Sequence, residues 1–148
     1  MPKEARLTLG LEPINRYETF LLNNVDQANQ FVQKVGPDSL RIHLDTFHMN
    51  LEESALVDAV RKAGRLLINM HVSDSNREAP GRGHIDFARL LGALRDMDDG
   101  GFLTLEPVPA GSDPLLASRM SKNNDLRDIY ARESIDYLKR LEEDLPRA

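Results

Sequence analysis

Residues 40–45 of the chain read LRIHLD and residues 66–72 read LLINMHV, and these two runs decide the fold. Both are short and rich in apolar residues without a helical period, so each predicts a β-strand. An amphipathic stretch from about residue 51 to residue 63 lies between them and ends at Gly64. The order strand, helix, strand with short connections predicts a parallel pair joined by a right-handed crossover.

The same alternation continues upstream. Residues 6–12 (RLTLGLE) predict a strand, and residues 25–35 (VDQANQFVQKV) predict a helix with Asn24 as N-cap and Gly36 as its stop. The apolar residues of this helix fall on one face and comprise Val25, Ala28, Phe31, Val32 and Val35.

The alternation also continues downstream. A polar loop over residues 73–83 precedes a predicted helix over residues 87–97, for which Asp86 is the expected N-cap and Gly100 and Gly101 the end. Two further elements follow, a strand over residues 102–106 (FLTLE) and a final helix from about residue 125 to residue 143.

Four βα units of about 30 residues each predict an α/β fold with a parallel sheet. We interpret residues 1–148 as a single domain that forms either half of a (β/α) barrel of the TIM type or a small open sheet. Because a half-barrel exposes two strand edges and an apolar face, we expect a partner, either a second copy or a missing N-terminal half.

Composition excludes several classes of protein. No run approaches the roughly 18 apolar residues that a membrane span requires, and the N-terminus lacks the apolar core of a secretory signal. The net charge is −5 and no basic run is present, so we expect neither membrane nor nucleic acid as partner. With no cysteine, any metal ligand must be carboxylate or imidazole, and we expect a cytoplasmic protein.

Each of the four predicted strands ends in an ionisable residue. A lone glutamate at such a place is usually a helix cap, and a lone histidine is usually a hydrogen-bonded core residue. Here the residues recur at spacings of 33, 26 and 35, close to one βα unit, and in a parallel barrel they would meet at one rim. Such a set predicts a divalent-metal site for Mn²⁺ or Mg²⁺, with Co²⁺ as an alternative. The four residues are Glu12, Asp45, His71 and Glu106.

The residues around these positions resemble the xylose-isomerase-like barrel superfamily, and within it the ketose 3-epimerases of the tagatose/psicose type. The resemblance extends from about Leu7 to Glu106 and corresponds to strands five to eight of the eight-stranded barrel. Three strings carry it: residues 12–18 (EPINRYE), residues 45–53 (DTFHMNLEE), and His71 with residues 76–83 (NREAPGRG).

The resemblance implies a function. In that family the two Glu, the Asp and the His hold one divalent metal, Mn²⁺ in most members, which binds two neighbouring oxygens of a ketose. One glutamate removes the proton at C3, an enediolate forms, and the other glutamate returns a proton to the opposite face. The resemblance therefore implies that Glu12 and Glu106 are catalytic as well as metal-binding.

The resemblance also implies that Glu18, His48 and Arg77 contact substrate oxygens. His48 is expected in a loop, and the Pro80–Gly83 turn is expected to fix the loop that presents Arg77. The alternative to substrate contact is a surface ion pair between Glu18 and Arg77.

Other functions remain open. Within the superfamily they are an aldose–ketose isomerase, a hydroxypyruvate isomerase, an inosose dehydratase or a sugar-phosphate epimerase. An abasic-site endonuclease is disfavoured because its three-metal cluster needs more histidines than the four in this chain. From a different class, the chain could be a non-catalytic half-barrel that needs a partner.

Overall fold

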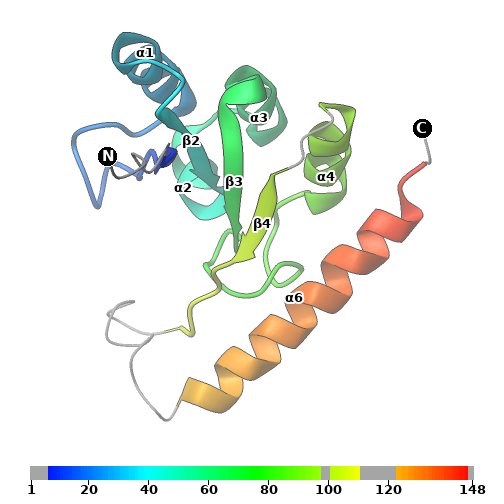
Figure 1. The fold of residues 1–148 in the computed structure, drawn as a ribbon. Coiled ribbons are helices and arrows are strands. Elements are labelled where there is room, and N and C mark those ends of the chain that lie inside the picture. The colour runs from blue at the N-terminus through cyan, green and yellow to red at the C-terminus, as the bar shows by residue number, and fades with distance from the viewer. Residues whose placement is uncertain (1–6, 98–100, 111–122, 147–148) are drawn as a thin grey trace, which may run out of the picture.

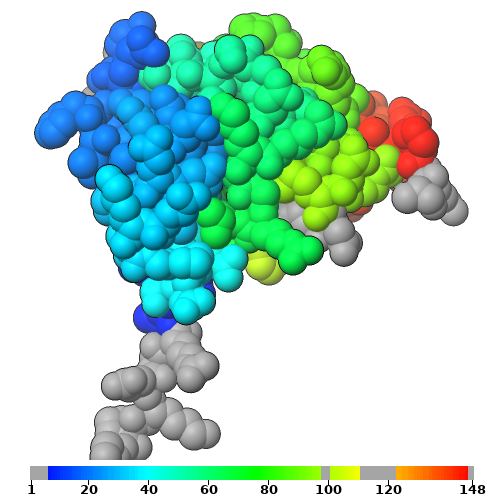
Figure 2. All heavy atoms as spheres, turned by 90° about the horizontal axis from the view of Figure 1, so that it is seen from above, coloured from blue at the N-terminus to red at the C-terminus, as the bar shows by residue number. Residues whose placement is uncertain are grey.

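The computed structural model describes residues 7–97, 101–110 and 123–146 of the chain. Within these residues four parallel strands form one sheet in the order β1-β2-β3-β4. In Figure 1, α1, α3 and α4 follow one another along the sheet and α6 runs diagonally past β4, while Figure 2 shows the same succession from above. The strands are β1 (Leu9–Leu11), β2 (Leu40–Asp45), β3 (Leu67–Val72) and β4 (Phe102–Leu105). The helices are α1 (Val25–Val35), α2 (Thr46–Glu52), α3 (Leu56–Ala63), the 3₁₀ turn η1 (Gly64–Leu66), α4 (Phe87–Asp96) and α6 (Asn124–Asp144).

Parallel pairing in chain order, with helices between the strands, is the arrangement of consecutive βα units. The predicted α/β fold with a parallel sheet of four consecutive βα units is confirmed. The two predicted N-caps are also confirmed. Asn24 forms a capping box with Gln27 at the start of α1, and the Asp86 carboxylate accepts a hydrogen bond from Arg89 N at the start of α4.

The core lies between the sheet and helices α1, α3 and α4. Successive side chains of a strand point to opposite faces, and in β2 and β3 one face is almost wholly buried. Apolar side chains from this face and from the helices form one cluster, which includes Ile42, Leu44, Met70, Val72, Val32, Val60 and Leu90. The other face of the sheet carries the polar strand-end residues.

The predicted helix over residues 51–63 has the expected end at Ala63 before Gly64, but its start is wrong, because the segment contains the end of α2 and the whole of α3, separated by residues 53–55. Helix α2 starts directly at the end of β2, where the Asp45 side chain accepts a hydrogen bond from Phe47 N. The segment breaks at Glu53, whose side chain instead accepts from Val25 N at the start of α1. His48 therefore lies in a helix and not in the loop that was expected.

Two smaller expectations also fail. Phe31 and Val35 on the predicted apolar face of α1 are exposed, because this helix packs chiefly against α3 and β2. Strand β1 begins at Leu9, so residues 7 and 8 are not part of it, and the predicted start at residue 6 lies outside the described part of the chain. The predicted end of α4 at Gly100 likewise lies outside it.

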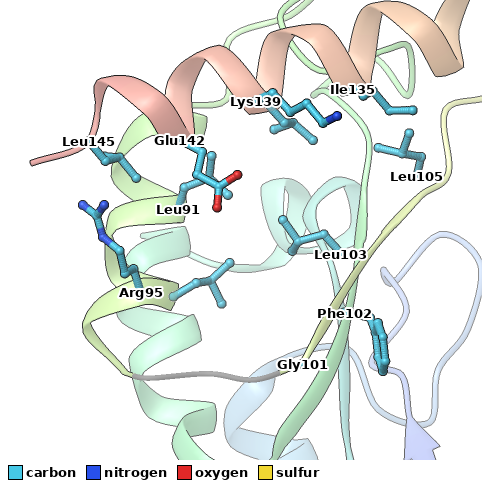
Figure 3. Close-up of a pocket in the computed structure, with 12 residues that line it drawn as sticks. Leu91, Arg95, Gly101, Phe102, Leu103, Leu105, Ile135, Lys139, Glu142 and Leu145 are labelled. Atoms are coloured by element: carbon cyan, nitrogen blue, oxygen red, sulfur yellow. The ribbon is translucent and has the colours of Figure 1, made fainter. Parts of the chain in front are cut away.

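An apolar hollow of about 600 Å³ lies between β4, α4 and α6. Figure 3 shows Leu103 reaching into it from β4, with Leu91 on α4 and Ile135 on α6 around it. None of the strand-end ionisable residues lines this hollow, so it is separate from the candidate site. Among the described residues no helix has the length and apolar character needed to cross a membrane.

Candidate metal centre

The ends of the four strands bring the four predicted ligands to one place. Asp45 is the last residue of β2, His71 is paired with it in the register of β3, and Glu12 and Glu106 directly follow β1 and β4. His71 Nδ1 lies 3.5 Å from Glu12 Oε1, 4.0 Å from Asp45 Oδ2 and 3.2 Å from Glu106 Oε2. Ligand atoms of Asp45, His71 and Glu106 lie within 4.8 Å of one another.

Two of these atoms are buried without an aligned hydrogen bond, although charged groups lie near both. Asp45 Oδ2 and His71 Nδ1 are inaccessible to solvent and have no aligned hydrogen bond in the structure. Leaving such atoms without a partner is costly, and native proteins rarely do so outside functional sites. Carboxylate oxygens with one imidazole nitrogen are ligands that suit Mn²⁺ and related divalent cations, so the residues present fit such an ion.

The electrostatics of the site favour an added cation. Burial raises the pKa of Glu12 to about 7, with further contributions from the nearby Asp45 and Glu106 carboxylates. Burial and the Asp45 carboxyl also raise the pKa of Glu106. Carboxylates at this spacing repel one another when all are ionised, and a divalent cation among them would remove that repulsion.

Arg77 already contributes one positive charge. Its Nη1 lies 3.0 Å from Asp45 Oδ2 and its Nη2 lies 2.5 Å from Glu106 Oε2, and the guanidinium stacks 4.8 Å from the Phe47 ring centre. The predicted alternative, a surface ion pair between Arg77 and Glu18, is not what the structure contains, because Arg77 contacts two of the predicted metal ligands.

Glu18 and His48 are joined through Asn15. The buried Asn15 amide donates to Glu18 Oε1 at 2.8 Å and lies 2.8 Å from His48 Nδ1, which makes that ring nitrogen the acceptor. Burial, followed by the charge of Arg77, lowers the pKa of His48, which favours the neutral imidazole. Sequence reasoning missed Asn15 as a site residue, although it lies inside the string EPINRYE.

A second set of polar side chains, which sequence reasoning also missed, lies on the same face of the sheet, two residues before the strand-end ligands. It consists of His43, Asn69 and Thr104. His43 is two residues before Asp45 and so shares its face of the sheet. Its ring meets His71 edge to face, with centroids 3.9 Å apart, and its Nε2 lies 3.3 Å from Asn69 Nδ2. Thr104 Oγ1 donates to Asn69 Oδ1 and extends the set to β4. The period-two alternation of strands was the signal that could have found it.

The loop that carries Arg77 is organised around Asp74. This carboxylate is fully buried, and it accepts hydrogen bonds from the backbone N–H groups of Ser75, Gly81 and Ile85. Gly81 adopts a positive φ of 93°, and a Cβ on Gly83 would lie 2.2 Å from Asp74 Oδ1. Both glycines of the turn are therefore required by its geometry.

The family model for the xylose isomerase-like TIM barrel matches residues 1–141 of the chain. A D-psicose 3-epimerase from Enterocloster bolteae is 43% identical over 105 residues, which are 71% of this chain and 35% of that protein. An L-ribulose 3-epimerase from Mesorhizobium japonicum is 36% identical over 130 residues, 87% of this chain and 43% of that protein.

Solved structures give the same result. The D-psicose 3-epimerase from Clostridium cellulolyticum H10, determined with D-tagatose, superposes with a TM-score of 0.77 at 33% identity. The match covers 88% of this chain and 48% of that one. The chain thus spans less than half the length of each of these three relatives.

Proposed function

Because the chain belongs to the xylose isomerase-like TIM barrel family, we propose that it supplies the metal-binding half of a sugar epimerase or isomerase acting on a ketose. The observation that carries the proposal is the convergence of Glu12, Asp45, His71 and Glu106, with two buried ligand atoms that lack hydrogen-bond partners. The names of the relatives, which include D-psicose 3-epimerase and L-ribulose 3-epimerase, support a ketose as the substrate class.

The four strand-end residues would hold one divalent cation, which we propose to be Mn²⁺, with Mg²⁺ and Co²⁺ as alternatives. When bound, such an ion polarises a carbonyl and stabilises negative charge on the neighbouring oxygen. Asp45 and His71 come from the inner strands β2 and β3, and Glu12 and Glu106 follow the outer strands β1 and β4. Two glutamates would thereby flank a sugar from opposite sides.

That placement suits inversion at a carbon. We propose that one of Glu12 and Glu106 removes the proton next to the ketose carbonyl, that an enediolate forms, and that the other glutamate returns a proton to the opposite face. General acid–base help of this kind is worth roughly 10²–10⁴-fold in rate.

Substrate oxygens would be held by Glu18, His48 and Arg77. The His48 ring retains its Nε2 position for a sugar hydroxyl, since Asn15 engages Nδ1. The superfamily alternatives, namely hydroxypyruvate isomerase, inosose dehydratase and sugar-phosphate epimerase, would use the same metal ligands with different groups opposite them.

We further propose that the partner of this sheet is a complementary set of four βα units, whether joined to this chain or separate from it. The relatives are more than twice as long as the matched segment, and both outer strands expose large apolar side chains. A homodimer is the alternative, but two copies of three carboxylates would then meet at one rim. A non-catalytic half-barrel would bind its partner and metal without turning over any sugar.

The test is proton exchange at C3 of a ketose. The chain, loaded with Mn²⁺, is incubated with D-fructose in D₂O, alone and with the N-terminal half of a D-psicose 3-epimerase. Deuterium at C3 and formation of the 3-epimer are followed by NMR and chromatography. We expect both in the reconstituted sample, and their loss in Glu106→Gln but not in Glu143→Gln, an exposed glutamate of α6. No exchange with any ketose, despite bound metal, would contradict the catalytic role.

A further inference from the structure

Arg77 is held in place by its backbone on two sides. It lies in the loop after β3 with a positive φ of 66°, which is unusual for a residue other than glycine. Its N–H donates to Asp74 O at 2.8 Å and its carbonyl accepts from Val108 N at 2.7 Å. A strained conformation fixed by both the β3 loop and the segment after β4 indicates that the position of this side chain matters.

The guanidinium lies where a metal ligand set would converge. It contacts Asp45 on β2 and Glu106 after β4, and Phe47 covers one of its faces. The side chain is only 19% exposed. Both carboxylates belong to the four residues proposed to hold a divalent cation, so Arg77 and such an ion need the same oxygens.

Arg77 fits this place poorly. Its Nη1 is buried and, although 3.0 Å from Asp45 Oδ2, forms no aligned hydrogen bond, and both Asp45 Oδ2 and His71 Nδ1 are left without one. A planar guanidinium donates only in its own plane, and it has no empty orbital for a lone pair of imidazole. A divalent ion can accept the lone pairs of a carboxylate and an imidazole together.

We propose that Arg77 and a divalent cation compete for Asp45 and Glu106, so that binding of the cation releases the guanidinium from both carboxylates. Arg77 is then a positioning residue that neutralises the acids until the ion arrives, and its freed donors become available to a bound sugar. The inference rests on the proposed metal site and deepens it by coupling cation binding to the placement of Arg77.

The test compares Mn²⁺ affinity in EDTA-treated wild type, Arg77→Lys and Arg77→Met, measured by titration calorimetry. All three side chains are unbranched at Cβ, so the strain of the positive φ is matched. Lysine keeps the charge but is a point donor that cannot bridge two carboxylates as arginine does. We expect both variants to bind Mn²⁺ more tightly than wild type, Arg77→Met by at least about fivefold. Before Mn²⁺ is added, both should unfold at lower urea concentration.

Arg82→Met is the matched control, since Arg82 lies on the same loop but pairs with Glu133 on α6. Tightening in Arg77→Met with none in Arg77→Lys, or equal tightening in Arg82→Met, would reduce the effect to simple charge repulsion and overturn the proposal. Unchanged or weaker affinity in both Arg77 variants would also overturn it. If no form of the chain bound Mn²⁺, the proposed metal site itself would fail.

A second readout does not depend on affinity. The side-chain Nε–Hε signal that disappears in Arg77→Lys identifies Arg77 in ¹H–¹⁵N spectra of the wild type. Titration with Mg²⁺, which is diamagnetic, should shift this signal as the guanidinium leaves its carboxylates. A signal that stays in place while Mg²⁺ binds would contradict displacement.

Discussion

The two inner strands and the two outer strands of this sheet have the same parallel pairing but very different surroundings. On β2 and β3 the side chains of Ile42 and Met70 are fully buried against the helices. On the outer strands Leu9 is 62% exposed and Phe102 is 76% exposed. Exposed apolar side chains on an edge strand are sites for pairing with another chain or segment. The inner pair is therefore complete within this chain, and the outer pair is built to be covered.

In the candidate metal centre the contrast separates Asp45 from Glu106, while His71 at 20% and Glu12 at 25% exposure are nearly alike. The inner ligand Asp45 is fully buried, and the ends of β2 and β3 are tied together by Thr46 Oγ1, which donates to Ser73 O and accepts from Ser73 N. The outer ligand Glu106 has a side chain that is 39% exposed. Asp45 is thus held rigidly by the chain itself, and Glu106 would gain order from a neighbour.

The largest expected effect is on stability. Ile42→Ala removes a fully buried side chain from β2 and should lower the free energy of unfolding by about 2–5 kcal/mol. Leu9→Ala on β1 is its matched control and should change it by no more than about 0.5 kcal/mol. Urea unfolding of the chain measures both, and equal losses would erase the distinction between inner and outer strands.

The stabilisation of the fold by bound metal should depend more on the inner ligand Asp45 than on the outer ligand Glu12. At a Mn²⁺ concentration about 100 times the dissociation constant, we expect a gain of about 2.7 kcal/mol in the free energy of unfolding. Asp45→Asn should lose this gain while retaining the cap of α2, since asparagine is a good N-cap. Glu12→Gln on the outer side should retain part of it, and Asp128→Asn, exposed on α6, all of it. A larger loss in Glu12→Gln than in Asp45→Asn would reverse the proposed order.

The loop after β3 should also be sensitive to substitution, though less so than the inner strands. Gly83→Ala places a Cβ against Asp74 and should cost about 1–3 kcal/mol of stability. Gly92→Ala is the contrasting control, because its Cβ meets only Leu145 at 3.9 Å inside α4, where alanine is favoured over glycine. Similar thermal unfolding of the two variants would show that the Asp74 loop is not rigidly packed.

The smallest effect on the chain alone is expected at the β4 edge. Phe102→Ser should change its stability by no more than about 0.5 kcal/mol, because the ring is already in solvent. The same change should weaken association with a complementary half-barrel, measured as mass in solution after mixing. Unimpaired association would exclude this edge from the interface.

Much of this arrangement could be predicted from the sequence, since it depends on local patterns. Strand β2 and helix α1 have the predicted bounds, because Asn24 and Gly36 mark the helix and the short apolar run LRIHLD marks the strand. The strand-end position of the four ionisable residues followed from the spacing of the βα units. The proximity of all four to His71 Nδ1 is what that spacing predicted.

The failures depend on contacts between distant segments. The break between α2 and α3 reflects the hydrogen bond from Val25 N to Glu53, which spans 28 residues and leaves no local signal. The position of Arg77 on Asp45 and Glu106 depends on the Asp74 loop and on the segment after β4. Asn15 was missed because an asparagine in a loop most often has a purely structural role, and only the fold places it beside His48.

The central claim is that four strand ends form one divalent-metal site, and metal content tests it most directly. The purified chain is treated with EDTA, equilibrated with Mn²⁺, freed of unbound ion and analysed for manganese together with its mass in solution. We predict about one tightly held ion per chain, lost in His71→Ala. A chain that retains no manganese, whether monomeric or dimeric, would contradict the account.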